Sequence, residues 1–174
     1  MAKKLKNSKS SIAATTENIS YTGNVTLKLR KGNRVIKTIY KSNNGTLRLF
    51  KGIALGLLQG FSASIDSYLP HFIGVGSNEG PTPLSINSPK LPGEYGRSRL
   101  FSGTMNVTRD SVVAPFEGII DNNITKGEPI KNVGLYGTSD TETLLAFIIL
   151  DEAYTIPQGM NLLIQWEISI QNKV

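Results

Sequence analysis

TLRLFKGIALGLLQGF, residues 46–61, is the only segment whose apolar side chains recur with the period of an α-helix. The apolar positions share one face of that helix, and they are Phe50, Ile53, Ala54, Leu57, Leu58 and Phe61. Nearly all of the other apolar segments alternate with polar residues, which is typical of β-strands. The sequence therefore predicts one helix, over about 46–61, that lies across a β-sheet.

Three glycines, Gly52, Gly56 and Gly60, recur every fourth residue on this helix and leave a ridge without side chains. Glycine costs roughly 1 kcal/mol in a helix interior relative to alanine, so three in register indicate a close approach to a neighbour. That neighbour is either the chain's own sheet or another subunit. A membrane span is not expected, because Arg48 and Lys51 leave an uncharged run shorter than the ~20 residues that a bilayer requires.

The strand predictions begin with a β-hairpin. Residues 24–30 and 34–40 alternate on either side of a turn at 31–33, with Val25, Leu27 and Leu29 on the buried face. Further strands are predicted at 70–76, 99–108, 111–120, 130–136, 143–150 and 162–171. In the last of these, one face is apolar and predicted to be buried, with Leu162, Ile164, Trp166, Ile168 and Ile170, and the opposite face is mostly polar. About eight short strands and one inserted helix favour a mainly β fold, a β-sandwich of jelly-roll type. A partly open barrel is the alternative.

Residues 77–96 contain four prolines and are predicted to form a long loop. Glu94, Arg97 and Arg99 gather at its end, and Glu94 could pair with either arginine. Two interpretations stay open for this group. It is either a surface ion pair worth ~0–1 kcal/mol or a polar contact that holds the loop against a neighbouring subunit.

Charge is distributed unevenly along the 174 residues. Residues 1–51 carry 12 Lys and Arg against one acidic residue, whereas residues 52–174 carry 7 against 12. Residues 1–19 are predicted to be a basic, extended N-terminal arm, and residues 20–174 a single β-sandwich domain. The candidate contacts with a protein partner or with DNA are Lys3, Lys4, Lys6 and Lys9 of the arm and Lys28, Arg30, Arg34 and Lys37 of the hairpin.

The sequence contains no recognisable catalytic or cofactor-binding motif. The chain has no cysteine, and its only histidine, His71, is interpreted as a partly buried structural residue. The glycines at 74–80 follow a strand but lack the spacing and the following helix of a dinucleotide site. Asp151 and Glu152 are adjacent and are interpreted as a solvated turn. The sequence thus predicts a protein that is not an enzyme and has no metal or cofactor.

Several segments in a fixed order carry a resemblance, namely FIGVGS (72–77), LPGE (91–94) with Arg97, NVGLYG (132–137), LLAFIIL (144–150) and IPQGMNLLIQWEISIQN (156–172). This order resembles small structural proteins of tailed bacteriophage virions, from neck, tail, baseplate or head-fibre modules. The resemblance implies a non-enzymatic virion component, made in the host cytoplasm, that forms a symmetric oligomer. It also implies contacts with portal, neck, tail or capsid proteins. A receptor- or glycan-binding module and an accessory DNA-binding protein are the alternatives.

Overall fold

The computed structural model describes residues 18–46, 48–52, 68–79, 83–102, 104, 106–109, 111–137 and 143–173. Its strands and one short helix run in the order β1 (Asn18–Lys31), β2 (Arg34–Ser42), β3 (Asn44–Gly45), β4 (Phe72–Gly76), β5 (Glu94–Arg99), β6 (Phe101–Ser102), β7 (Asn106–Val107), β8 (Ser111–Asp121), α2 (Asn122–Thr125), β9 (Ile130–Tyr136), β10 (Leu144–Tyr154) and β11 (Asn161–Lys173).

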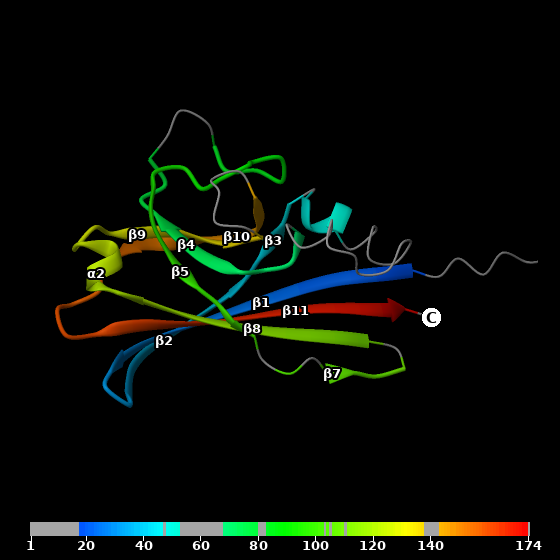
Figure 1. Cartoon of the computed structure of the whole chain (residues 1–174), viewed down its shortest axis with the longest axis horizontal. Coiled ribbons are helices and arrows are strands. Elements are labelled where there is room, and N and C mark those ends of the chain that lie inside the picture. Colours follow the sequence, from blue (N-terminus) through cyan, green and yellow to red (C-terminus); the bar gives the residue numbers. More distant parts are fainter. Residues whose placement is uncertain are drawn as a thin grey trace, which may run out of the picture.

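The strands form two antiparallel sheets that face each other (Figure 1). Sheet A has the order β2-β1-β11-β8-β6, with β7 also paired to β8. Sheet B has the order β3-β10-β9-β4-β5. The mainly β, two-sheet sandwich predicted from the sequence is confirmed, while its jelly-roll type stays a prediction.

The core lies between the inner faces of the two sheets. On β11, Leu162, Ile164, Trp166 and Ile168 are all buried, as the alternation of that segment predicted. They pack with residues of sheet B such as Val133 in one continuous apolar cluster. Removing this apolar surface from water is the main stabilisation of the sandwich.

The predicted hairpin is confirmed, and its two strands extend beyond the residues that show the alternating apolar pattern. β1 and β2 pair around a turn in which Gly32 has a φ of +58°, a conformation that glycine adopts without strain. Val25, Leu27 and Leu29 are buried, as predicted. β1 also pairs with β11 along its whole length, which places the start of β1 beside the end of β11 (Figure 1).

The predicted strand at 99–108 and the predicted loop at 77–96 are wrong in their bounds. The expected strand at 99–108 is divided between β5, β6 and β7, and β5 begins at Glu94, inside the expected loop. β5 has almost no apolar residues, because it is the edge strand of sheet B and pairs on one side only, with β4. An edge strand of this kind carries little of the alternation that sequence analysis detects.

The predicted helix is described only in part. Residues 48–52 are helical, and the remainder of the predicted helix lies outside the described residues. Thr46 bonds this segment to sheet B, since its hydroxyl donates to the Leu144 carbonyl at 2.8 Å. A Cβ at Gly52 would lie 2.5 Å from the Cβ of Tyr68, so this glycine approaches the chain itself. Gly56 and Gly60 lie outside the described residues.

The proline-containing segment packs on the chain itself. It connects β4 to β5 and lies on the face of sheet B turned away from sheet A (Figure 1). There Leu91, which is 1% exposed, forms a second apolar cluster with Tyr136, Leu144 and Phe147. This part of the molecule is therefore a third layer over sheet B.

Gly76→Ala is expected to lower the free energy of unfolding by about 1–3 kcal/mol. The added Cβ would lie 2.6 Å from Oδ1 of Asn132 and 2.8 Å from the carbonyl oxygen of Pro92, so the covering loop would have to move. Urea denaturation monitored by Trp166 fluorescence measures the change. Ser98→Ala on neighbouring β5, whose side chain makes a 3.5 Å bond only to the adjacent Arg99 carbonyl, should change stability by less than about 0.5 kcal/mol.

Candidate functional site

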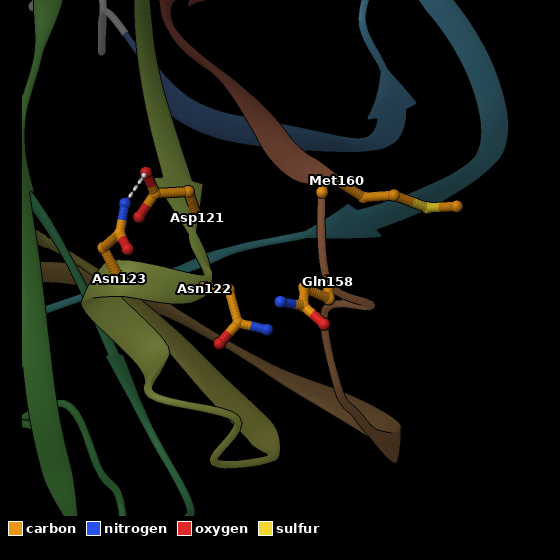
Figure 2. Close-up of a pocket in the computed structure, with 6 residues that line it drawn as sticks. Asp121, Asn122, Asn123, Gln158 and Met160 are labelled. Carbon is orange, nitrogen blue, oxygen red and sulfur yellow. Dashed lines mark hydrogen bonds between the residues drawn. The ribbon is translucent and has the colours of Figure 1, made fainter.

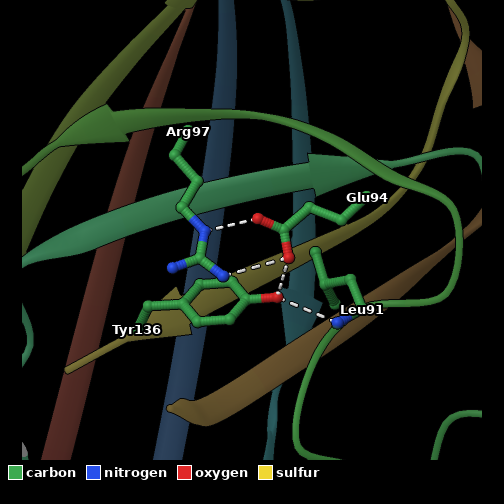
Figure 3. Close-up of polar contacts among 4 residues, drawn as sticks. All are labelled: Leu91, Glu94, Arg97 and Tyr136. Atoms are coloured by element: carbon green, nitrogen blue, oxygen red, sulfur yellow. Dashed lines mark hydrogen bonds and ion pairs between the residues drawn. The ribbon is translucent and has the colours of Figure 1, made fainter. Parts of the chain in front are cut away.

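Glu94 and Arg97 form an ion pair at the start of β5 (Figure 3). The Arg97 Nε donates to Oε1 of Glu94, and Nη2 donates to Oε2 at 3.2 Å. Each side chain is only 13% exposed. The pair is therefore mostly buried, and the interpretation as an ordinary surface ion pair is wrong.

Tyr136 of β9 completes the Glu94–Arg97 pair. The Tyr136 hydroxyl donates to Oε2 of Glu94 and accepts from the Leu91 backbone N–H at 2.8 Å. The Arg97 guanidinium lies over the Tyr136 ring, 3.6 Å from its centroid. Gly74 makes room for that ring, because a Cβ there would lie 2.6 Å from Cε2 of Tyr136. We call these four residues, Leu91, Glu94, Arg97 and Tyr136, the loop clasp.

The loop clasp holds the loop to the chain's own sheet. Sequence analysis identified Glu94 and Arg97 but missed Tyr136, which contacts them across 42 and 39 residues of sequence. It also missed Leu91, whose backbone N–H donates to Tyr136 across 45 residues. Arg99 does not join them and is exposed at the end of β5. The expected contact of Glu94, Arg97 and Arg99 with a neighbouring subunit stays a prediction.

Protonation of the loop clasp is set by burial and charge. Burial raises the pKa of the Tyr136 hydroxyl, and the adjacent Glu94 carboxylate raises it further. Burial would lower the pKa of Arg97, but the bonds to Glu94 raise it above its ordinary value. The hydroxyl thus stays protonated and the guanidinium charged over the whole physiological range.

Stability is expected to fall as the pH rises above about 10. Burial raises the pKa of Tyr95 to about 12 and also raises the pKa of Tyr21, Tyr136 and Tyr154. Unfolded tyrosines ionise near pH 10, so these four favour folding fully below that pH and less as it approaches 12. Urea denaturation at a series of pH values, with tyrosinate absorbance as a second signal, measures this. Stability that stays constant up to pH 12 would contradict the burial of these hydroxyls.

The basic residues of the hairpin do not share a face, which corrects the sequence interpretation. Lys28 and Arg30 lie on the outer face of sheet A, the face turned away from sheet B. Lys37 is opposite the buried Leu29, on the inner side. A register shift between Leu29 and Arg30 places Arg34 opposite Lys31, whereas the unshifted register would place it opposite Gly32, on the face of Lys28 and Arg30. The four cations therefore form no continuous basic surface.

Lysines on the inner side of β2 instead contact sheet B. The Lys37 ammonium lies 5.3 Å from the centroid of the Tyr154 ring, and the Lys41 ammonium donates to Asp151 at 2.5 Å. The hydrogen bond and the charge of Lys41 lower the pKa of Asp151. Asp151 and Glu152 lie within β10, so their interpretation as a turn is wrong. The arm lysines, Lys3, Lys4, Lys6 and Lys9, lie outside the described residues.

A polar pocket of about 470 Å³ lies at one end of the sandwich, between α2 and the turn before β11 (Figure 2). It is lined by Asp121, Asn122, Asn123, Gln158, Gly159 and Met160. Asp121 caps α2 by accepting from the Ile124 N–H at 3.1 Å, and its other oxygen accepts from Asn123. The Asn122 amide donates to the Ile156 carbonyl. Much of the polar lining thus serves the fold itself, and no aromatic ring is among the lining residues.

The outer face of sheet A carries large exposed side chains. One row across five strands consists of Tyr40, Thr26, Gln165, Glu117 and Phe101. The aromatic residues at its two ends are 74% and 63% exposed. Ile119, on the same face, is 37% exposed. In the described part of the chain no segment covers this face as the loop covers sheet B, and the two aromatic side chains are separated on it by three polar residues.

Sequence analysis did not identify this row. Tyr40 and Phe101 are separated by about sixty residues, and only the strand order brings them to the same face. Gln165 and Glu117 between them are joined by a 2.6 Å hydrogen bond. The alternation of β11 indicated a polar outer face, but it gave no information about the two edge strands.

The described residues contain no metal-ligand cluster and no membrane-spanning helix. No three acidic or histidine side chains among them gather closely enough to hold a metal ion. His71 is half-buried, as expected, and its backbone N–H donates to the Tyr136 carbonyl at 2.8 Å. Of the helices described, none combines the length and the apolar composition that crossing a bilayer requires.

Comparison of the chain with protein-family models, with curated proteins and with solved structures gives no match. The fold is a two-sheet sandwich. The β4–β5 loop covers the outer face of sheet B, and no described segment covers the outer face of sheet A. Function is argued from these surfaces.

Proposed function

We propose that the chain is a non-enzymatic structural component of a tailed bacteriophage virion. In this proposal it assembles as a symmetric oligomer and joins neck, tail or capsid components through its β-domain and its basic N-terminal arm. The ordered motifs between residues 72 and 172 support the virion assignment by resemblance. The finding that carries the assembly part is the uncovered outer face of sheet A, with Tyr40, Phe101 and Ile119 exposed on it.

A rigid sandwich is suited to this role. The loop clasp fixes the loop between β4 and β5, and both faces of sheet B are packed within the chain. The uncovered face then offers one defined surface that can repeat around a symmetry axis. Native mass spectrometry of the purified full chain is expected to find a closed oligomer. A monomer at every concentration tested would contradict the oligomeric part of the proposal.

An accessory DNA-binding protein is the second candidate, favoured by the 12 basic residues among residues 1–51. Neutralising Lys28, Arg30, Arg34 and Lys37 together to Gln would then weaken DNA binding and flatten its dependence on salt. The distribution of these residues over two faces predicts no such change. A loss of salt-dependent DNA affinity in this variant would favour the DNA-binding candidate over the structural one.

A glycan-binding module is the third candidate, and it would use the polar pocket beside α2. Carboxylate and amide groups such as Asp121 and Gln158 suit sugar hydroxyls, but a stacking aromatic is absent from the lining. Screening the full chain against immobilised host glycans tests it. Binding that is lost in Gln158→Ala would favour this candidate.

A further inference from the structure

A groove of about 220 Å³ crosses the outer face of sheet A over β1, β11 and β8. Asn24 and Pro115 form its sides, and Glu117 and Glu167 contribute the charge. Glu167 is exposed, and Glu117 is partly exposed beside Gln165. Neither carboxylate has a basic partner among the described residues. We call this feature the carboxylate groove.

The two carboxylates have a defined spacing. Glu117 is opposite Gln165 in the register of β8 and β11, and Glu167 lies two residues further along β11. Diagonal neighbours of this kind in an antiparallel pair are about 7–8 Å apart. A ligand for the groove should therefore present two positive charges at about that separation.

The arm supplies such a pair of charges. Lys4 and Lys6 are two residues apart, which is about 7 Å in an extended chain, and both project to the same side. Lys3 and Lys9 add further positive charge on the same segment. The spacing of Lys4 and Lys6 matches that of the two carboxylates in the carboxylate groove, and their charge is opposite in sign.

The direction of β1 indicates which copy of the arm fits. β1 begins at Asn18, opposite Lys173 at the end of sheet A, and runs from there past Asn24 toward the hairpin (Figure 1). The arm therefore joins β1 at Asn18, six residues before Asn24, at the strand end that points away from the groove. Residues 12–17, IAATTE, contain no Gly, Pro, Asn, Asp or Ser to favour a reversal. The 14 residues from Lys4 to Asn18 can span up to about 45–50 Å, enough to reach a neighbouring copy.

We propose that the N-terminal arm of one copy docks in the carboxylate groove of a neighbouring copy, with Lys4 and Lys6 facing Glu117 and Glu167. This inference rests on the oligomeric part of the proposed function and identifies the contact that links the copies. Single exposed ion pairs are weak, so affinity comes from repeating the contact around a closed oligomer. Added salt should weaken the assembly, because it screens these charges.

Carbodiimide cross-linking of the full chain tests the contact, since the reagent joins lysine amines directly to carboxylates. Equal amounts of ordinary and isotopically heavy chains are mixed, cross-linked and digested for mass spectrometry. The expected products join Lys4 or Lys6 to Glu117 or Glu167 and combine light with heavy peptides. Exposed Glu128 and Glu152 serve as control carboxylates and should not link to the arm.

A charge exchange provides the second test. Glu117→Lys with Glu167→Lys should raise the dissociation constant of the oligomer at least tenfold in sedimentation experiments. Glu128→Lys with Glu152→Lys changes the net charge equally and should leave that constant within about twofold. Adding Lys4→Glu and Lys6→Glu to the first pair should restore association, which a merely misfolded variant could not do. Far-ultraviolet circular dichroism confirms the fold of each variant.

Each outcome of the two tests either supports the arm contact or overturns it. Cross-links confined to single chains would show that the arm packs on its own copy and would overturn the inference, as would arm cross-links spread equally over Glu128 and Glu152. Association that is insensitive to the charge exchange would overturn it too. Recovery of the chain from purified particles tests the proposed function separately, and it can succeed even where the arm contact fails.

Discussion

Arg97→Met is expected to lower the free energy of unfolding by about 3 kcal/mol. The substitution leaves the Glu94 carboxylate with the Tyr136 hydroxyl as its remaining partner in a site that is only 13% exposed. Removing one partner of a buried ion pair costs about 3–5 kcal/mol. The lower end of that range applies here, because some solvent reaches Glu94 and Arg97. Chemical denaturation of the purified chain measures the change.

The matched control removes both charges. Glu94→Gln with Arg97→Met should cost at least about 1 kcal/mol less than Arg97→Met alone, because no uncompensated carboxylate is left behind. Arg99→Met, two residues along the same strand, should change stability by less than about 0.5 kcal/mol, since Arg99 is exposed. If Arg97 and Arg99 proved equally tolerant of substitution, the loop clasp would have no structural role.

Leu91→Ala is expected to lower the free energy of unfolding by about 2–4 kcal/mol and to expose the covering loop to protease. Leu91 is 1% exposed and packs with Tyr136, Leu144 and Phe147 on the outer side of sheet B. Lys90 immediately before it is exposed, so trypsin cleavage after Lys90 reports on loop release. Limited proteolysis under native conditions should show faster cleavage at this bond in the variant.

Ile86→Ala provides the control within the same loop. Ile86 is 50% exposed, so its truncation should change the free energy of unfolding by less than about 0.5 kcal/mol. The rate of cleavage after Lys90 should stay the same. Equal cleavage rates for Leu91→Ala and the unmodified chain would mean that the loop is not held by its apolar contact. The three-layer description of sheet B would then be wrong.

Regular alternation made much of the sandwich predictable. β11 and the β1–β2 hairpin bury the residues that their patterns indicated, because one face of each strand meets the core. β5 was not predicted, since it is an edge strand with a glycine and several polar residues. The inner and outer apolar clusters of sheet B were not distinguished either, because strands that are buried on both faces show continuous apolar runs.

The candidate sites were less predictable than the fold. The local spacing of Glu94 and Arg97 indicated their pairing, but Tyr136 contacts them through strand order that a single sequence does not reveal. For the hairpin, the sequence indicated a polar face rich in Lys and Arg, although Arg34 and Lys37 are three residues apart and strict alternation would place them on opposite faces. The register shift after Leu29 separates Arg34 from Arg30, and Lys37 turns inward to Tyr154.

Glycines in the motifs that carry the resemblance have structural reasons in this chain. Gly74 and Gly134 leave room for the Tyr136 ring and for Leu91, and Gly76 lies under the Pro92 carbonyl. The motifs therefore encode the covering loop and its contact with sheet B.

Quantitative mass spectrometry of purified particles, with this chain counted against the portal protein, tests the central claim most directly. The proposal predicts that the chain copurifies with particles at a fixed ratio. A count near one ring would place it at a neck, tail or vertex, and hundreds of copies would make it a capsid decoration. Absence of the chain from particles that contain the portal protein would contradict the structural role and favour the DNA-binding candidate.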